Sequence, residues 1–346
     1  MRHPGGPVSS WGGRAALALA SILALGLAVG LAVSIGEMRI PLATALGAIS
    51  DRVLGTAFVA SRIQVGIIWD YRLSRALVAA CCGASLALSG TILQALLRNP
   101  LAEPYVLGIS AGASTGAVAV LIVGFGGGVL TLSGGAFCGA ILAIALVALL
   151  AMGSGGGTDR IVLAGVAGSQ LFNALTSYIV TTSASAEQAR GVMFWLLGSL
   201  GGVRWPDVGL AAPVALAGFA VAAFHARALD AFAFGSDAAA ALGVPVARVR
   251  LVLFGLAAAM TACMVSIVGS IGFVGLVVPH AARFLVGPGH ARLLPASLML
   301  GAIFMVLADI VSRILVPQQV LPIGVVTALA GAPAFAVILY RSRRFA

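Results

Sequence analysis

The chain has 346 residues, of which 61% are hydrophobic and 9% are charged, whereas an ordinary globular domain carries roughly 25% charged residues. So few charges cannot cover the surface of a soluble fold, and so many apolar residues exclude a disordered chain. The composition therefore predicts an all-α integral membrane protein.

The net charge of +10 comes from arginine alone, because the chain has no lysine. A P-loop holds nucleotide phosphates with a lysine, so this chain has no ATPase of that type. The arginines are scattered between apolar runs instead of gathered on one face, which argues against nucleic-acid binding.

Uncharged runs, bounded by arginine, glycine and proline, predict about ten transmembrane helices, each about 20 residues long. The segment 36–71 is too polar for a span, and residues 104–158 carry no charge and fit two spans that break near Gly124–Gly128. The other predicted spans are residues 15–35, 75–97, 161–183, 207–225, 249–268, 273–287, 293–312 and 323–340.

An even number of spans puts both termini on one side, and arginine counts place that side in the cytoplasm. Twelve of the 20 arginines then lie inside and eight outside, in agreement with the positive-inside rule. Five of the outer arginines fall between residues 39 and 75. This outer excess predicts an acidic partner on the outer surface.

Several short motifs occur in a specific order from about residue 65 onward. They are Arg72–Arg75 (RLSR), Ser89–Pro104 (SGTILQALLRNPLAEP), Leu107–Ala113 (LGISAGA), Gly272–His280 (GFVGLVVPH), Ala308–Arg313 (ADIVSR), Leu321–Thr327 (LPIGVVT) and Gly331–Pro333 (GAP). Together they resemble the FecCD-type permeases, which import vitamin B12, haem and ferric siderophores. Ser74 departs from the family, which often has proline at that position.

The resemblance implies a single permease domain over residues 1–346 of a multi-pass protein in the bacterial inner membrane. It implies a homodimer with the path on its axis, two copies of a separate ABC ATPase that bind ATP and magnesium, and one periplasmic substrate-binding protein. No cofactor or metal is expected in this chain. The predicted cargo is an iron chelate, either haem or a ferric siderophore, and the alternative is cobalamin.

The resemblance also implies a docking site for the binding protein at Arg72, Arg75 and Arg313. Charged rims of this kind speed docking and fix its register. The alternative is that these arginines anchor helix ends at the headgroups, or that Arg313 pairs with Asp309 four residues earlier. A structural ion pair is the predicted role of Asp309.

The loop at residues 226–250 is the predicted cytoplasmic element that couples to the ATPase. Ser236 or Asp237 can cap a short alanine-rich helix, Gly243 can end it, and Pro245 prevents its continuation. An ordinary capped surface turn would look the same. The predicted coupling residues are Gly235, Ser236, Asp237, Ala241, Leu242 and Gly243.

Two helix ends carry the predicted cytoplasmic gate, at Asn99 and Leu101 and at Thr158 and Asp159. Small polar and apolar side chains can close a pore without binding cargo tightly, although plain helix termination explains the same residues. His280 is predicted to be a packed or interfacial histidine, with haem ligation as the alternative.

Two other classes of protein compete with the importer. A secondary transporter usually needs an ionisable residue near the midplane, and here the acids fall near predicted helix ends or loops. An intramembrane enzyme has no support from a histidine–glutamate zinc motif or from paired aspartates in the spans. Dependence of transport on ATP separates the three classes.

Overall fold

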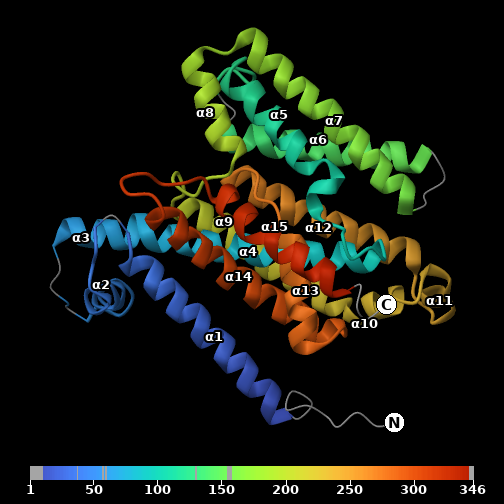
Figure 1. Ribbon diagram of the computed structural model, residues 1–346, viewed down its shortest axis with the longest axis horizontal. Helices are drawn as coiled ribbons and strands as arrows, with labels where there is room; N and C mark the ends of the chain where they lie inside the picture. The colour runs from blue at the N-terminus through green and yellow to red at the C-terminus, as the bar shows by residue number, and fades with distance from the viewer. Residues whose placement is uncertain are drawn as a thin grey trace.

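The structure is a computed structural model that describes residues 11–36, 38–56, 58, 61–128, 131–153 and 158–342. Helices make up most of this chain (Figure 1). In chain order they are α1 (Trp11–Ser34), α2 (Leu42–Leu54), α3 (Arg62–Gly66), the π-helical turn η2 (Ile67–Leu73), α4 (Ser74–Leu96), the 3₁₀ turn η3 (Pro104–Leu107), α5 (Ile109–Leu121), α6 (Leu132–Gly153), α7 (Thr158–Ser183), α8 (Ala186–Leu196), α9 (Trp205–Phe224), α10 (Ala226–Phe232), α11 (Ser236–Ala241), α12 (Val246–Val268), α13 (Val274–Val286), α14 (His290–Ile314) and α15 (Ile323–Ser342).

A helix occupies each of the ten ranges that the uncharged runs predicted. Six apolar helices are long enough to cross a bilayer, and α5, α13 and α15 provide shorter apolar segments. The 13 residues of α5 and of α13 rise about 20 Å, which is less than the roughly 30 Å hydrocarbon core. Six clear spans therefore make this a multi-pass membrane protein, and the total of ten stays a prediction.

The sequence predicted that the second span begins at residue 75, and this start is wrong. The helix begins at Arg62 and continues through η2 into α4, so that one apolar helix covers Arg62–Leu96. Charged residues before Arg75 end a predicted span, but inside the bundle Arg72 and Arg75 are bonded to other segments. The segment 36–71 is also helical over much of its length, in α2 and α3.

Helix α4 forms the centre of the bundle, with 83% of its apolar window buried. It packs against α9, α12, α13 and α14 (Figure 1). A side chain at Gly83 would overlap the carbonyl oxygen of Gly301 in α14, and one at Gly90 would overlap that of Gly275. These glycines allow the backbones to approach closely, as small residues do in membrane helix pairs.

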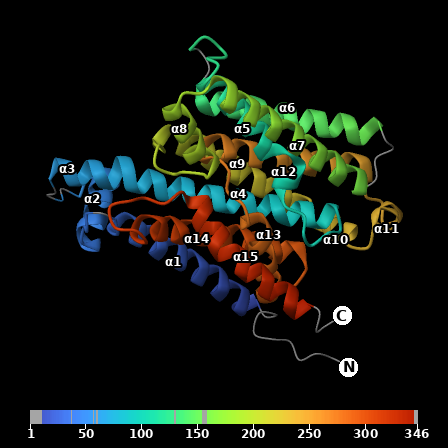
Figure 2. The same ribbon diagram turned by 45° about the horizontal axis from the view of Figure 1, so that its top comes forward.

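Gly112 and Gly116, four residues apart in α5, also form a packing surface. Side chains at Gly112 and Gly116 would collide with the backbone of α6 at Gly139 and Gly135. In Figures 1 and 2, α5, α6, α7 and α8 form one group beside α4, whereas α1 lies along the opposite edge of the bundle.

The bundle has two ends with different contents. Helices α2 and α3 lie at one end, and α10 and α11 lie at the other in both views (Figures 1 and 2). The first is called the arginine end and the second the α10–α11 end.

Candidate functional site

The three arginines predicted for docking meet at the arginine end. Together with Arg204 they line one hollow of about 380 Å³. This arginine hollow is formed by Arg72, Arg75, Arg204 and Arg313. Four guanidinium groups around one opening make it a strongly positive site, which suits an acidic ligand surface.

Arg72 is bonded inward, to the end of α1 and to the chain that follows it. Its Nη1 donates to the carbonyls of Val33 at 2.9 Å and Ser34 at 3.0 Å, and its Nη2 donates to the Met38 carbonyl. The residue is only 8% exposed. Arg72 therefore closes the end of α1 onto the second span.

Asp309 in α14 binds the other two predicted docking residues. Arg75 donates to Asp309 Oδ1 through Nε and Nη2, both at 2.7 Å. Arg313 Nη2 lies 3.1 Å from Asp309 Oδ2, and Arg313 Nη1 donates to the Ile35 carbonyl at 2.8 Å. The predicted structural ion pair of Asp309 is confirmed, and it joins α4 to α14.

The fourth arginine of the hollow was missed by sequence reasoning. The Arg204 guanidinium lies 4.4 Å from the ring centre of Tyr71 and donates to the Val203 carbonyl. The signal in the sequence was its place beside Trp205, whose indole packs on Trp69 with ring centres 4.8 Å apart. The aromatic pair brings the segment before α9 onto η2 and so places Arg204 at the hollow.

The predicted coupling loop folds as α10 and α11 with sharp turns around α11. Gly235 and Gly243 have φ of 106° and 82°, values that favour glycine. Ser236 and Asp237 were expected to cap α11, but no side chain caps it. The Ser236 hydroxyl accepts from Arg250 Nη2 at 2.8 Å instead, which ties α11 to α12.

Large apolar side chains project from this loop. Phe234 is 78% exposed and Leu242 is 71% exposed. Ala241 ends α11 beside Leu242. These two exposed apolar side chains are available to contact another protein or lipid.

The predicted gate residues of the first helix end follow α4 near the same end of the bundle. The Asn99 side-chain oxygen accepts from the Leu101 N–H at 2.8 Å, which makes a tight local turn. Leu101 is 47% exposed. At the second helix end α7 begins at Thr158, and the side chains of Thr158 and Asp159 lie outside the described residues.

A bridge between two loops follows these gate residues and was not predicted. The Glu103 carboxylate accepts from the Phe273 N–H at 2.7 Å, and the Tyr105 hydroxyl accepts from the Ile271 N–H. Ser110 donates to Ser270 at 2.8 Å. The segment between α4 and α5 is thereby fastened to the loop that begins α13, where Phe273 has a φ of 69°.

His280 in α13 is half-buried, and its Nδ1 lies 2.8 Å from the Leu276 carbonyl of the same helix. Among the residues that the structure describes, no group of three or more histidine, cysteine, aspartate or glutamate residues could hold a metal ion. The geometry of His280 is that of a packed helix residue.

Comparison with known proteins gives a consistent result. A family model described as the FecCD transport family matches residues 22–341. The chain is 39% identical to the cobalamin import system permease protein BtuC of Halobacterium salinarum, over 93% of this chain and 88% of that protein. It is 37% identical to the Fe(3+) dicitrate transport system permease protein FecD of Escherichia coli, over 84% of this chain and 91% of that protein.

A solved structure shares the fold. That structure is described as an inward-facing conformation of an ABC transporter assigned to the metal-chelate type. The TM-score is 0.81 at 32% identity, and the match covers 94% of this chain and 99% of that one.

Proposed function

Because this chain belongs to the FecCD transport family, we propose that it is one of two identical permease subunits that import an iron chelate across the bacterial inner membrane. The observation that carries the proposal is the family match over residues 22–341. The relatives are permease subunits and not enzymes, so ATP hydrolysis belongs to a separate partner.

The relatives' names include several cargoes, and two of them agree with the cargoes predicted from the sequence. The iron-dicitrate permease supports a ferric chelate, and the cobalamin permease, which matches more of this chain, supports cobalamin as the second candidate. Neither description includes haem, so haem stays a prediction from the sequence. All three are large complexes of a metal ion.

The proposed subunit has ten spans and both termini in the cytoplasm, as the arginine distribution predicts. Residues 1–346 form one permease domain, and the loop at 226–250 faces the cytoplasm. The arginine end then faces the periplasm and the α10–α11 end faces the ATPase.

In this arrangement the arginine hollow binds the substrate-binding protein. Arg72, Arg75 and Arg313 carry three positive charges, of which Asp309 compensates one. Because Arg72 and Arg313 are largely buried in their own chain, we propose that they act through the positive field of the hollow, and that Arg204 contributes to it. Such a field steers an acidic partner at long range.

At the opposite end, α11 and its flanking glycines couple the permease to the ATPase. Leu242 and Phe234 supply exposed apolar contacts, and Arg250 fixes the turn through Ser236. Movement of this loop would shift α12, which follows it directly, and so rock the subunits between two access states. Asn99, Leu101, Thr158 and Asp159 would close the path on the cytoplasmic side.

The cargo can be decided by uptake. The permease is reconstituted in liposomes with its ATPase and its binding protein, and uptake of ferric citrate, a ferric hydroxamate, haem and cobalamin is followed in parallel. The proposal expects ATP-dependent uptake of one ferric chelate. Uptake of cobalamin alone would establish the second candidate, and uptake of none of the four would contradict import of a metal chelate.

A further inference from the structure

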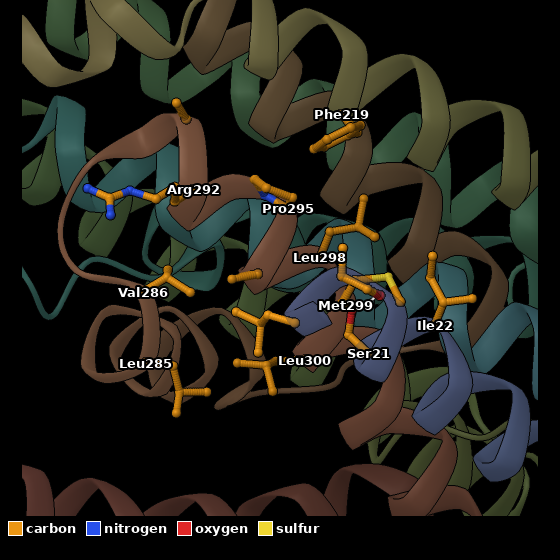
Figure 3. A pocket seen from close by; sticks show the side chains of 14 residues that line it. Ser21, Ile22, Phe219, Leu285, Val286, Arg292, Pro295, Leu298, Met299 and Leu300 are labelled. Atoms are coloured by element: carbon orange, nitrogen blue, oxygen red, sulfur yellow. Dashed lines mark hydrogen bonds between the residues drawn. The ribbon is translucent and has the colours of Figure 1, made fainter. Parts of the chain in front are cut away.

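A cavity lies between α1 and α14 on the side of the bundle, and it reaches the α10–α11 end. Its volume is about 550 Å³, within the roughly 300–1,000 Å³ range of ligand pockets. It is bounded by α1, by Phe219 of α9, by the last turn of α13 and by the first three turns of α14 (Figure 3). Only 17% of the apolar window of α1 is buried, so this helix lies at the edge of the bundle.

The wall of the cavity is apolar. Ile22 of α1 and Leu285 of α13 line it and are 60% and 57% exposed, so the cavity opens outward. Ser21 is the one uncharged polar residue of the wall, and its hydroxyl donates to the Ala18 carbonyl at 2.8 Å. The cavity therefore offers no free polar group along its length and suits a hydrocarbon chain.

One charged residue lies at the rim of the cavity, with its guanidinium directed away from the apolar side chains (Figure 3). Arg292 lies in the first turn of α14, on the far side of the cavity from Ile22 (Figure 3). Its side chain is exposed, and among the described side chains no carboxylate pairs with it. An exposed guanidinium at the end of an apolar groove is complementary to a phosphate with a hydrocarbon tail.

The position of the groove along the helices agrees with one leaflet of a membrane. Both α1 and α14 are long apolar helices, and from Arg292 to Leu300 the groove follows α14 for eight residues, or about 12 Å. That length is close to the roughly 15 Å of hydrocarbon in one leaflet. The bond between Asp230 of α10 and His290, at the start of α14, places Arg292 at the α10–α11 end.

We propose that this groove binds one acyl chain of an anionic phospholipid whose phosphate pairs with Arg292. The lipid fills the space between α1 and α14 and stabilises the contact of the first helix with the bundle. The site depends on the membrane position of the helices and not on the cargo or the transport cycle.

Native mass spectrometry of the delipidated full-length chain tests the proposal with two probes, palmitoyl-oleoyl phosphatidylglycerol and palmitoyl-oleoyl phosphatidylcholine. The wild-type chain is expected to retain one phosphatidylglycerol with about fivefold preference over phosphatidylcholine, as one arginine at a membrane surface supplies. Arg292→Gln should abolish the preference and keep one lipid of either kind. Ala296→Trp, which fills the groove, should remove both.

The matched control is Arg160→Gln, which removes an exposed arginine from the start of α7 and should keep the preference. If Ala296→Trp does not fold, Ala18→Trp fills the same groove from α1. An unchanged preference in Arg292→Gln would overturn the proposal, as would lipid retention by both folded tryptophan variants. A wild-type chain that retains no lipid would also overturn it.

Discussion

At the scale of single residues, Asp309 holds the arginine end together. Its side chain is 1% exposed and lies between two arginines that are 14% and 8% exposed. Removing one partner of a buried ion pair leaves charge without compensation, which costs about 3–5 kcal/mol. The carboxylate is therefore the residue whose neutralisation does most damage to this end of the bundle.

Asp309→Asn should lower the thermal unfolding midpoint of the detergent-solubilised chain by several degrees, because Arg75 and Arg313 lose their counter-charge. Asp237→Asn, which neutralises an exposed carboxylate in α11, is the matched control and should melt with the wild type. Equal midpoints for the two variants would show that the ion pair does not stabilise the fold.

The residue scale also shows what the sequence could and could not predict. The motif order identified Arg72, Arg75 and Arg313 as a group, and the pair of Arg313 with Asp309 follows from their spacing of four. The bond of Arg75 to Asp309 joins residues 234 positions apart, and no local pattern reports such a contact. Glu103 was visible only as part of a motif, because its partner Phe273 lies 170 positions away in sequence.

At the scale of elements, the close contacts of α4 depend on glycine. Gly83→Ala puts a methyl group into the carbonyl oxygen of Gly301, and overpacking of this kind costs about 1–3 kcal/mol. The thermal midpoint should fall, although alanine favours helix formation by about 1 kcal/mol over glycine elsewhere.

Gly26→Ala in α1 is the matched control, because nothing lies within 4 Å of the added methyl group. It should leave the midpoint unchanged or raise it slightly. The same loss of stability in both variants would indicate that close packing of α4 on α14 is not the cause.

The coupling loop gives a second prediction for an element. Leu242→Asp places a charge on a side chain that is 71% exposed, so the permease should fold normally. ATP-driven uptake should fall about tenfold or more, as expected when a central apolar contact is lost at an interface. The matched control is Leu54→Asp, at a side chain that is 75% exposed in α2 near the other end of the bundle. This control should bind the ATPase as the wild type does, whereas Leu242→Asp should bind it less. If both variants bind the ATPase fully, α11 does not belong to the interface.

Elements could be predicted wherever charge marks their ends. All ten predicted ranges contain a helix, because uncharged runs of this length have few alternatives in a bilayer. The charge pattern gave a wrong boundary between residues 36 and 75, because the helix from Arg62 to Leu96 carries Asp70, Arg72 and Arg75 within it. The two arginines are tolerated because Arg72 finds partners at and after the end of α1 and Arg75 finds one in α14, and only the folded bundle supplies these partners.

At the scale of the whole molecule, the two ends of the bundle differ in their chemistry. One end presents the positive arginine hollow and the other presents exposed apolar side chains on a short turn. The central helix α4 connects them, since Arg75 lies near its start and Asn99 follows its end. This polarity fits a permease that binds an acidic partner on one side and an ATPase on the other.

The direct test of this account is the energy source of transport. In liposomes that hold the permease, its ATPase and its binding protein, uptake of the metal chelate is measured with ATP inside, with a non-hydrolysable analogue, and with an imposed proton or sodium gradient without ATP. We expect uptake only with hydrolysable ATP and with the binding protein present. Uptake driven by an ion gradient without ATP would contradict the importer and make the chain a secondary transporter.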